Sequence, residues 1–146
     1  MAKVLFTIGY EGFEIGEFVA HLKNNDIDCL LDVREIPLSR KRGFSKRALA
    51  QRLKQADIHY VHLRDLGSPK SIREDLKLTE NYSNFFDKIE KHLVEKKESI
   101  ETAYKYVVNY TCCLMCFERL AARCHRKMVA AKIQERDGNG LKIKNV

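Results

Sequence analysis

The apolar residues of this chain alternate between short, nearly unbroken runs and longer stretches in which they recur every three or four positions. The short runs predict strands at residues 4–8, 29–33, 58–63, 111–117 and 141–143. The longer stretches predict helices at residues 13–25, after Ser45, in several pieces over 71–110, and up to about residue 136. This alternation predicts an α/β fold, a three-layer βαβ sandwich with a mostly parallel sheet of about five strands.

Length and composition indicate one domain over residues 1–146, with 45% hydrophobic and 32% charged residues. No apolar run approaches the roughly 20 residues needed to span a bilayer, so no membrane partner is expected. The first residues lack a signal-peptide pattern, which predicts a cytoplasmic location. Five cysteines without a repeating framework predict reduced thiols rather than a disulfide scaffold.

The positive charge is concentrated in one segment. The chain has a net charge of +7. Residues 34–54 contain one acidic residue, Glu35, and eight basic ones: Arg34, Arg40, Lys41, Arg42, Lys46, Arg47, Arg52 and Lys54. Such a cluster attracts anionic partners, either a small molecule or nucleotide or a nucleic acid. For residues 46–54, a plain solvated helix face is an equally good interpretation.

Polar groups follow several predicted strands at the point where each strand ends. In parallel sheets the ligand crevice lies outside the carboxyl ends of the strands, so these groups are expected to share one edge. Tyr10 and Glu11 lie between two glycines, where the backbone can approach a ligand closely. Arg34, Ser39 and Arg40 supply donors for an anion, although Arg34 is also placed to form a structural ion pair with Asp32.

The cysteines near the end of the chain are candidates for redox and metal chemistry. Cys113 and Cys116 form a C-x-x-C pair, but residues three apart on a strand point to opposite faces. A zinc site formed by Cys113, Cys116, Cys124 and His125 lacks the turn that usually brings zinc ligands together. We therefore expect no metal and no cofactor, and a metal-supported structural domain is the weakest alternative.

The triplet Cys124-His125-Arg126 allows two structures. If residues 118–136 form one helix, Cys124 belongs to the core. If the helix starts near residue 124, its N-terminus creates an anion site, where Arg126 can hold the anion. In an enzyme, Glu118 or His125 would act as acid or base, and Cys124 or Cys116 as nucleophile.

These motifs together resemble the family of domains of unknown function number 488 (DUF488). The resemblance rests on TIGYEG at residues 7–12, DVREIPLSR at 32–40, GFS at 43–45, YVHL at 60–63, LG at 66–67, LMCFE at 114–118 and CHR at 124–126. It covers almost the whole chain and implies a fold and a site, without an established reaction. Leu120-Ala121-Ala122 departs from the polar or proline-containing turn common in such proteins and favours the continuous helix.

Two functions are predicted from these observations. The first is an enzyme that binds a phosphorylated or nucleotide-like anion at the carboxyl edge of the sheet, held by Arg34, Arg40 and Arg126. The second is a non-enzymatic nucleic-acid-binding module that uses residues 34–54. The two differ in salt dependence, because neutralising nucleic-acid phosphates makes the affinity fall steeply with salt.

Overall fold

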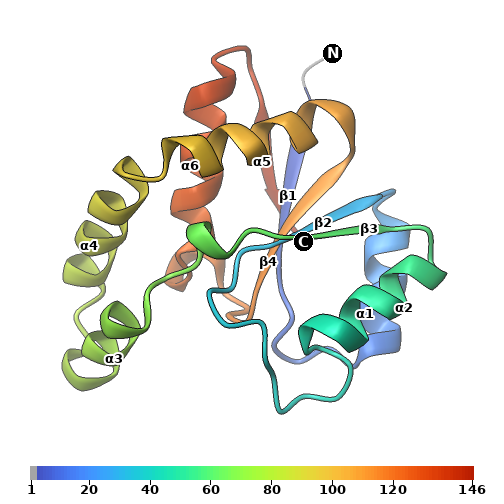
Figure 1. The fold of residues 1–146 in the computed structure, drawn as a ribbon, viewed down its shortest axis with the longest axis horizontal. Helices are drawn as coiled ribbons and strands as arrows, with labels where there is room; N and C mark the ends of the chain where they lie inside the picture. Colours follow the sequence, from blue (N-terminus) through green and yellow to red (C-terminus); the bar gives the residue numbers. More distant parts are fainter. Residues whose placement is uncertain (1–2) are drawn as a thin grey trace.

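The computed structural model describes residues 3–146, so the first two residues of the predicted domain 1–146 lie outside the described part. Its centre is one sheet whose neighbouring strands all run parallel, in the order β3-β2-β4-β1-β5 (Figure 1). The strands are β1 (Val4–Gly9), β2 (Cys29–Asp32), β3 (His59–His62), β4 (Cys112–Cys116) and β5 (Lys142–Asn145). The predicted α/β sandwich is therefore confirmed, with a sheet that is parallel throughout.

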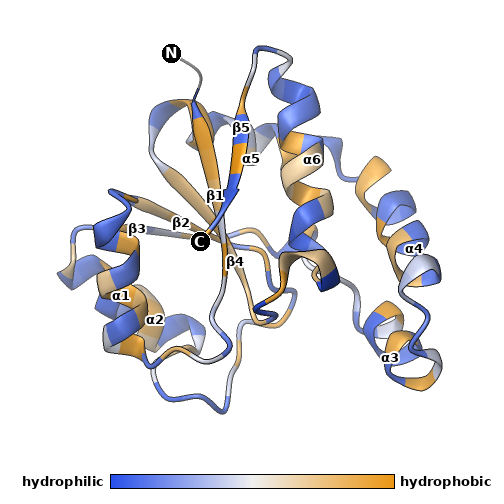
Figure 2. Ribbon diagram, turned by 180° about the vertical axis from the view of Figure 1, so that it is seen from behind, coloured by the Kyte–Doolittle hydropathy of each residue, from blue (hydrophilic) through white to orange (hydrophobic). Residues whose placement is uncertain are grey.

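Helices cover both faces of the sheet. They are α1 (Ile15–Asn24), α2 (Lys46–Gln55), α3 (Lys70–Thr79), α4 (Tyr82–Val94), α5 (Lys97–Asn109) and α6 (Arg126–Asp137), with short 3-10 turns at Arg64–Leu66 and Ala121–Arg123. Helices α1 and α2 lie together on one face, and α5 and α6 cover the other (Figure 1). Helices α3 and α4 extend to the side of the sheet, where α4 packs against α6. Figure 2 shows apolar residues along the central strands.

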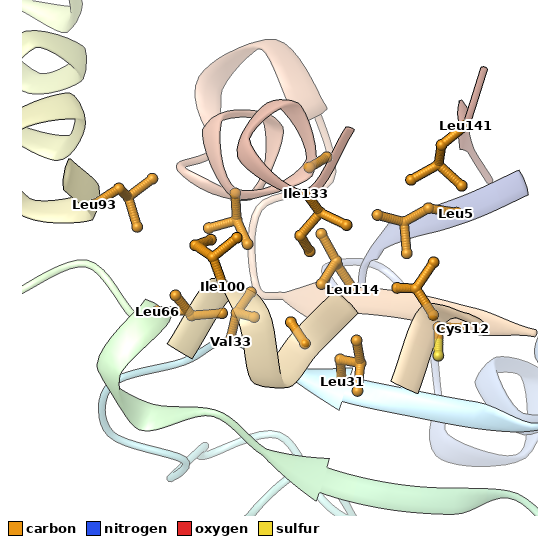
Figure 3. Close-up of a cluster of buried hydrophobic side chains, with 14 of the residues drawn as sticks. Leu5, Leu31, Val33, Leu66, Leu93, Ile100, Cys112, Leu114, Ile133 and Leu141 are labelled. Atoms are coloured by element: carbon orange, nitrogen blue, oxygen red, sulfur yellow. The ribbon is translucent and has the colours of Figure 1, made fainter. Parts of the chain in front are cut away.

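The core has two halves because the central strands are buried on both faces. On β4, Cys112 and Leu114 belong to the half covered by α5 and α6, and Cys113 and Met115 to the half covered by α1 and α2. Figure 3 shows the first half, in which Leu114 lies among Leu5, Leu31 and Ile133. This alternation is the two-residue period of a strand, and it explains why the runs read from the sequence are apolar without interruption.

Most predicted strands and helices are confirmed within a few residues. Ser45 occupies the N-cap position of α2, and its hydroxyl group bonds to the backbone of Ser39 rather than to the helix. Within the predicted helical stretch 71–110, α3 begins at Lys70 and α5 at Lys97. Of the two structures predicted for residues 118–136, the helix that starts near residue 124 is confirmed and the continuous helix is wrong, because α6 starts at Arg126.

Candidate functional site

The carboxyl ends of β1, β2 and β4 meet at one edge because β4 lies between the other two strands. A cavity of about 370 Å³ opens at this edge. Its walls consist of Tyr10, Arg34, Glu35, Ile36, Leu38, Ser68, Arg73, Cys116, Phe117, Glu118, Cys124 and His125. Segments distant in sequence therefore share one cavity, and Arg34 and His125 are both in its walls, as predicted.

A second hollow of about 380 Å³ adjoins this cavity on the side of α3 and α4. Both hollows are lined by Ser68, Arg73, Glu118, Cys124 and His125. Residues Leu76, Lys77, Glu80, Tyr82, Phe85 and Arg123 complete the second one. A ligand in either hollow would therefore contact the wall formed by these five shared residues.

The segment between β4 and α6 brings Cys124 back to the end of β4. It leaves the sheet alongside the end of β1, where the Tyr10 N–H donates to the Cys116 carbonyl at 3.0 Å. A Cβ atom placed on Gly9 would lie only 1.7 Å from the carbonyl oxygen of Glu118. The missing side chain at residue 9 therefore allows the segment to cross β1 closely before it turns into α6.

Arg126 fixes this segment from the opposite side. Its guanidinium donates hydrogen bonds to the carbonyl of Glu118, to the carbonyl of Arg119 at 3.2 Å and to Thr7 Oγ1 at 3.2 Å. It also donates to Cys116 Sγ at 3.2 Å. Arg126 is only 1% exposed and is not in the walls of either hollow. The prediction that Arg126 binds a ligand anion is therefore corrected, because its guanidinium N–H groups donate to atoms of the protein itself.

The charge of Arg126 has no carboxylate partner at salt-bridge distance within residues 3–146. Burial lowers the pKa of Arg126, but an arginine side chain still stays protonated at neutral pH. A buried cation favours a negative charge beside it. Because Nη1 contacts Cys116 Sγ, the structure favours the thiolate form of Cys116 whenever this cysteine is reduced.

Cys116 and Cys124 are joined in a disulfide, so the prediction of reduced thiols throughout is wrong for this pair. Their sulfur atoms lie where the end of β4 meets the start of α6, and the Arg126 backbone N–H donates to Cys124 Sγ at 3.5 Å. Cys29, Cys112 and Cys113 are free and buried. Burial raises the pKa of Cys113, which therefore resists ionisation. Cys113 lies in the half of the core covered by α1 and α2. This agrees with the prediction that Cys113 and Cys116, three residues apart on a strand, point to opposite faces.

His125 is held as a neutral imidazole. Its Nε2–H donates to the Val33 carbonyl at 2.8 Å, which leaves Nδ1 unprotonated and 3.7 Å from Cys124 Sγ. Burial, together with the positive charges of Arg126 and Arg73, lowers the pKa of His125 to about 4. Such a weak base is poorly suited to the predicted acid–base role at neutral pH.

Three possible metal ligands also meet at this point. Cys116, Cys124 and His125 each offer one donor atom, and these three atoms lie within 4.8 Å of one another, a grouping that suits a metal ion.

Comparison with known proteins places this chain in a family. Residues 14–133, well over half of the chain, match the family described as "Domain of unknown function DUF488". The chain belongs to the DUF488 family. The resemblance inferred from the motifs is confirmed, and the motifs at 32–40 and 114–126 fall inside the matched range.

The other two comparisons gave no match, either among curated proteins or among solved structures. Within residues 3–146, no helix of this DUF488 protein is both long and apolar enough to cross a bilayer. A cytoplasmic location stays a prediction.

Arg34 of this DUF488 protein forms the structural ion pair that the sequence left open. Its Nε and Nη2 bind both carboxylate oxygens of Asp32, at 2.9 and 2.8 Å. Its Nη1 donates to the Phe44 carbonyl at 2.7 Å and to the Tyr10 hydroxyl at 3.3 Å. All three guanidinium nitrogens are thus engaged. Arg34 and Tyr10 form part of the cavity wall, but the guanidinium of Arg34 has little remaining hydrogen-bonding capacity to bind an anion.

The two predicted glutamates have different places. Glu118 is in the walls of both hollows, and the partial loss of water around its carboxyl group and the nearby Glu11 carboxylate raise its pKa. A raised pKa suits a carboxyl group to proton transfer near neutral pH. Glu11 is outside both hollows, and its Oε1 accepts a hydrogen bond from the Arg119 N–H at 3.1 Å. Glu11 therefore positions the β4–α6 segment rather than a ligand.

Ser39 and Arg40 lie outside the cavity, contrary to prediction. Ser39 is used within its own loop, since its N–H donates to Ser45 Oγ at 3.0 Å and its hydroxyl accepts from the Lys41 N–H at 3.1 Å. Arg40 is exposed and belongs to neither hollow. The loop after Arg34 turns away from the strand ends, so sequence proximity to Arg34 does not bring these two residues to the site.

Two residues of the shared wall, Ser68 and Arg73, were not predicted to have a functional role. Arg73 comes from α3 and donates to the Ser68 carbonyl, and it also contacts Glu35 Oε1 at 3.3 Å. Ser68 lies in the segment that follows β3, and the strand-end rule applies to such a segment. Arg73 had no such signal, because a residue one turn into a helix reaches the site only through the position of that helix.

Proposed function

We propose that this DUF488 protein is an enzyme that carries out thiol–disulfide exchange on a small, negatively charged substrate in the cavity at the carboxyl edge of the sheet. The observation that carries the proposal is the pairing of Cys116 and Cys124 in the cavity wall, beside the buried guanidinium of Arg126. Thiolates are the reactive form of cysteine, and a neighbouring cation or a helix N-terminus stabilises them. Here Arg126 supplies the cation and α6 the N-terminus.

Cys124 is the better placed of the two sulfurs to attack a substrate. It is in the walls of both hollows, whereas Cys116 is in only one. Its sulfur accepts the Arg126 backbone N–H at the start of α6 and lies beside the unprotonated Nδ1 of His125. Cys116 then acts as the resolving cysteine, because the hydrogen bond from Arg126 Nη1 stabilises it as a thiolate.

The exchange transfers two electrons from the cysteine pair to the substrate. The Cys124 thiolate attacks one sulfur of a substrate disulfide, which forms a mixed disulfide and releases the other half as a thiolate. The Cys116 thiolate then attacks Cys124 Sγ and displaces the second half. Both released thiolates take up protons from water. The enzyme is left with the Cys116–Cys124 disulfide, and a low-molecular-weight dithiol reduces it by the reverse steps.

The preference for a negatively charged substrate rests on cations other than those expected from the sequence. Arg73 lies in the wall shared by both hollows, and Arg123 lies in the second hollow, over the ring of Tyr82. Glu118 is also in the walls, and Glu35 pairs with Arg73, so an anionic group would bind on the Arg123 side of the second hollow. The net charge of +7 favours the approach of such a substrate.

The proposal is tested with the fully reduced, folded protein and dithiobis(nitrobenzoate), an anionic aromatic disulfide that releases a coloured thiolate. The wild-type chain is expected to release two equivalents quickly, one from each exchange step. The Cys116→Ser variant should release one equivalent and keep a mixed disulfide on Cys124, detectable by mass spectrometry. The Cys124→Ser variant should react at least about tenfold more slowly, because Cys116 is in the walls of only one hollow and lacks the helix N–H that stabilises the Cys124 thiolate.

The matched control is Cys113→Ser, which removes a buried thiol of the same strand on the other side of the sheet. It should react like the wild-type chain. Rapid release from Cys124→Ser, or a Cys113→Ser variant as slow as Cys124→Ser, would contradict the proposed role of the pair. All reactions are run with a metal chelator present, so that bound metal does not affect the rates.

Nucleic-acid binding is a second candidate, and a different observation favours it. Seven cations follow Arg34 in the basic segment: Arg40, Lys41, Arg42, Lys46, Arg47, Arg52 and Lys54. Within residues 3–146, none of the seven has a carboxylate at salt-bridge distance, and all except Lys41 are exposed. Unpaired exposed cations on one helix and the loop before it suit contacts to phosphates.

A filter-binding titration with DNA and RNA oligonucleotides at two salt concentrations tests this candidate. If the basic segment binds phosphates, affinity should fall steeply with salt, with a slope of about −0.9 per neutralised phosphate in duplex DNA. The triple variant Lys46→Ala, Arg47→Ala, Lys54→Ala should bind at least about tenfold more weakly. A control with three exposed lysines of α4 and α5 replaced, Lys91→Ala, Lys97→Ala and Lys105→Ala, should keep most of the affinity. Equal losses in both variants would rule out a specific role for the segment.

A further inference from the structure

We infer that the reduced form of this chain binds a zinc-class divalent ion through Cys116, Cys124 and His125, with a fourth coordination position open to the cavity. The inference goes beyond the proposed exchange activity, since it needs only that the two sulfurs are reduced. The three donor atoms lie within 4.8 Å of one another, and all three residues are buried. No other group of three or more such residues within residues 3–146 is arranged in this way.

The backbone geometry suits two thiolates on one metal ion. Zinc binds sulfur at about 2.3 Å and imidazole nitrogen at about 2.0 Å, so its ligand atoms lie roughly 3.5 Å apart. The Cα atoms of Cys116 and Cys124 lie 7.6 Å apart, longer than the roughly 4.4–6.8 Å of most disulfides. After reduction the sulfurs can separate by rotation of their side chains, and an ion then fits between them and His125.

His125 is already fixed in the form that a metal ion requires. Its Nε2–H is donated to the Val33 carbonyl at 2.8 Å, so the lone pair of Nδ1 faces the sulfur of Cys124. Metal-binding histidines commonly donate their other ring N–H to a carbonyl or carboxylate in this manner, which sets the tautomer and the ring orientation. The imidazole therefore needs no rearrangement to become a ligand.

The charges of the site also favour a divalent cation. Two adjacent thiolates repel each other, and Arg126 supplies only one positive charge to balance them. A divalent ion neutralises both thiolates, while the hydrogen bonds from Arg126 to Cys116 Sγ and Cys124 Sγ remain in place as support. Binding releases the remaining thiol protons to the solvent.

The fourth position distinguishes this site from a structural zinc site. Structural sites have four protein ligands, whereas catalytic sites have three and leave one position for water or substrate. The sequence-based search for four ligands included Cys113, which instead lies in the other half of the core. Cys116, Cys124 and His125 all line the same cavity, together with Glu118. The open position therefore faces the space in which a substrate would bind.

The test uses the whole chain, reduced under anaerobic conditions with a dithiol that is itself oxidised to a disulfide and then removed. Cobalt(II) serves as the spectroscopic probe, and zinc as the competitor. The reduced wild-type chain should bind one cobalt ion with thiolate-to-metal charge-transfer bands and the intense ligand-field bands of a four-coordinate site, and zinc should displace it. Cys116→Ser, Cys124→Ser and His125→Gln should each weaken binding at least about tenfold, while the control Cys113→Ser should bind like the wild-type chain.

Two outcomes would overturn the inference. One is a folded, reduced wild-type chain that retains no stoichiometric zinc after desalting, as measured by elemental analysis. The other is a Cys113→Ser variant that loses as much affinity as Cys116→Ser, which would place the metal elsewhere. Circular dichroism confirms that each variant is folded. Because the exchange assay is run with a chelator and the metal titration without a disulfide substrate, failure of one leaves the result of the other interpretable.

Discussion

Replacing Gly9 with alanine is expected to lower the free energy of unfolding by about 3 kcal/mol, because overpacking against rigid backbone costs roughly 1–3 kcal/mol or more. The new Cβ atom would lie 1.7 Å from the Glu118 carbonyl oxygen and 2.8 Å from the Arg119 Cα atom. No side-chain rotation relieves a contact with backbone, so the β4–α6 segment has to move away from β1. Urea unfolding followed by circular dichroism measures the loss.

The same displacement should also reach the cysteines. Cys124 is held near Cys116 by this segment, so the reduced Gly9→Ala variant should react more slowly with dithiobis(nitrobenzoate) than the wild-type chain. The control is Gly16→Ala in α1, where the only side-chain neighbour of the added Cβ would be Arg52 Nη2 at 3.8 Å. That variant should be as stable as the wild-type chain or up to about 1 kcal/mol more stable, since alanine favours helix. Equal stability of the two variants would show that the segment adapts without strain.

Replacing Arg126 with alanine is expected to lower the free energy of unfolding by about 3 kcal/mol. The carbonyls of Glu118 and Arg119 and the hydroxyl of Thr7 lose their donor, and an unsatisfied buried acceptor costs about 1–3 kcal/mol. Removing a buried cation that lacks a carboxylate partner offsets part of this loss. The anion-holding role expected for Arg126 from the sequence would instead predict a loss of ligand binding.

The matched control for this prediction is Arg136→Ala, ten residues further along α6. Arg136 forms an exposed ion pair with Glu101, and its loss should change the free energy of unfolding far less, because exposed ion pairs contribute little to stability. Arg126→Ala should also slow the reaction of the reduced cysteines, because Arg126 contacts Cys116 Sγ. Arg136→Ala should leave this reaction unchanged, because Arg136 lies at the far end of α6. A stability loss no larger than that of Arg136→Ala would mean that water replaces the guanidinium at these carbonyls.

The chain order of strands and helices was predictable because both signals are local. An unbroken run such as residues 111–117 indicates a strand buried on both faces, and the structure has β4 there, at Cys112–Cys116. The strand-end rule also placed Tyr10, Arg34 and Glu118 at one edge correctly. It failed for Ser39 and Arg40, because the path of the loop after Arg34 depends on contacts that the rule does not contain.

The preference for one continuous helix over residues 118–136 was the main error, and its cause is tertiary. Leu120-Ala121-Ala122 favours helix by intrinsic propensity, yet the segment makes only a 3-10 turn there. The close crossing over Gly9 and the hydrogen bonds from Arg126 to two backbone carbonyls override that local preference. The same contacts bring Cys124 to Cys116, and so the cysteine pair could not be read from spacing either.

The sequence by itself determined the α/β class, the buried central strands and the edge of the sheet where a site would lie, because hydrophobic periodicity and strand direction are encoded locally. Only the tertiary structure decided what that edge contains. It paired Cys116 with Cys124, turned Arg126 inward as a buried cation, fixed His125 as a neutral imidazole and brought Arg73 to the cavity wall. Each of these features depends on contacts between residues that are distant in the sequence. Hydrophobic periodicity reports only local structure and does not determine such contacts.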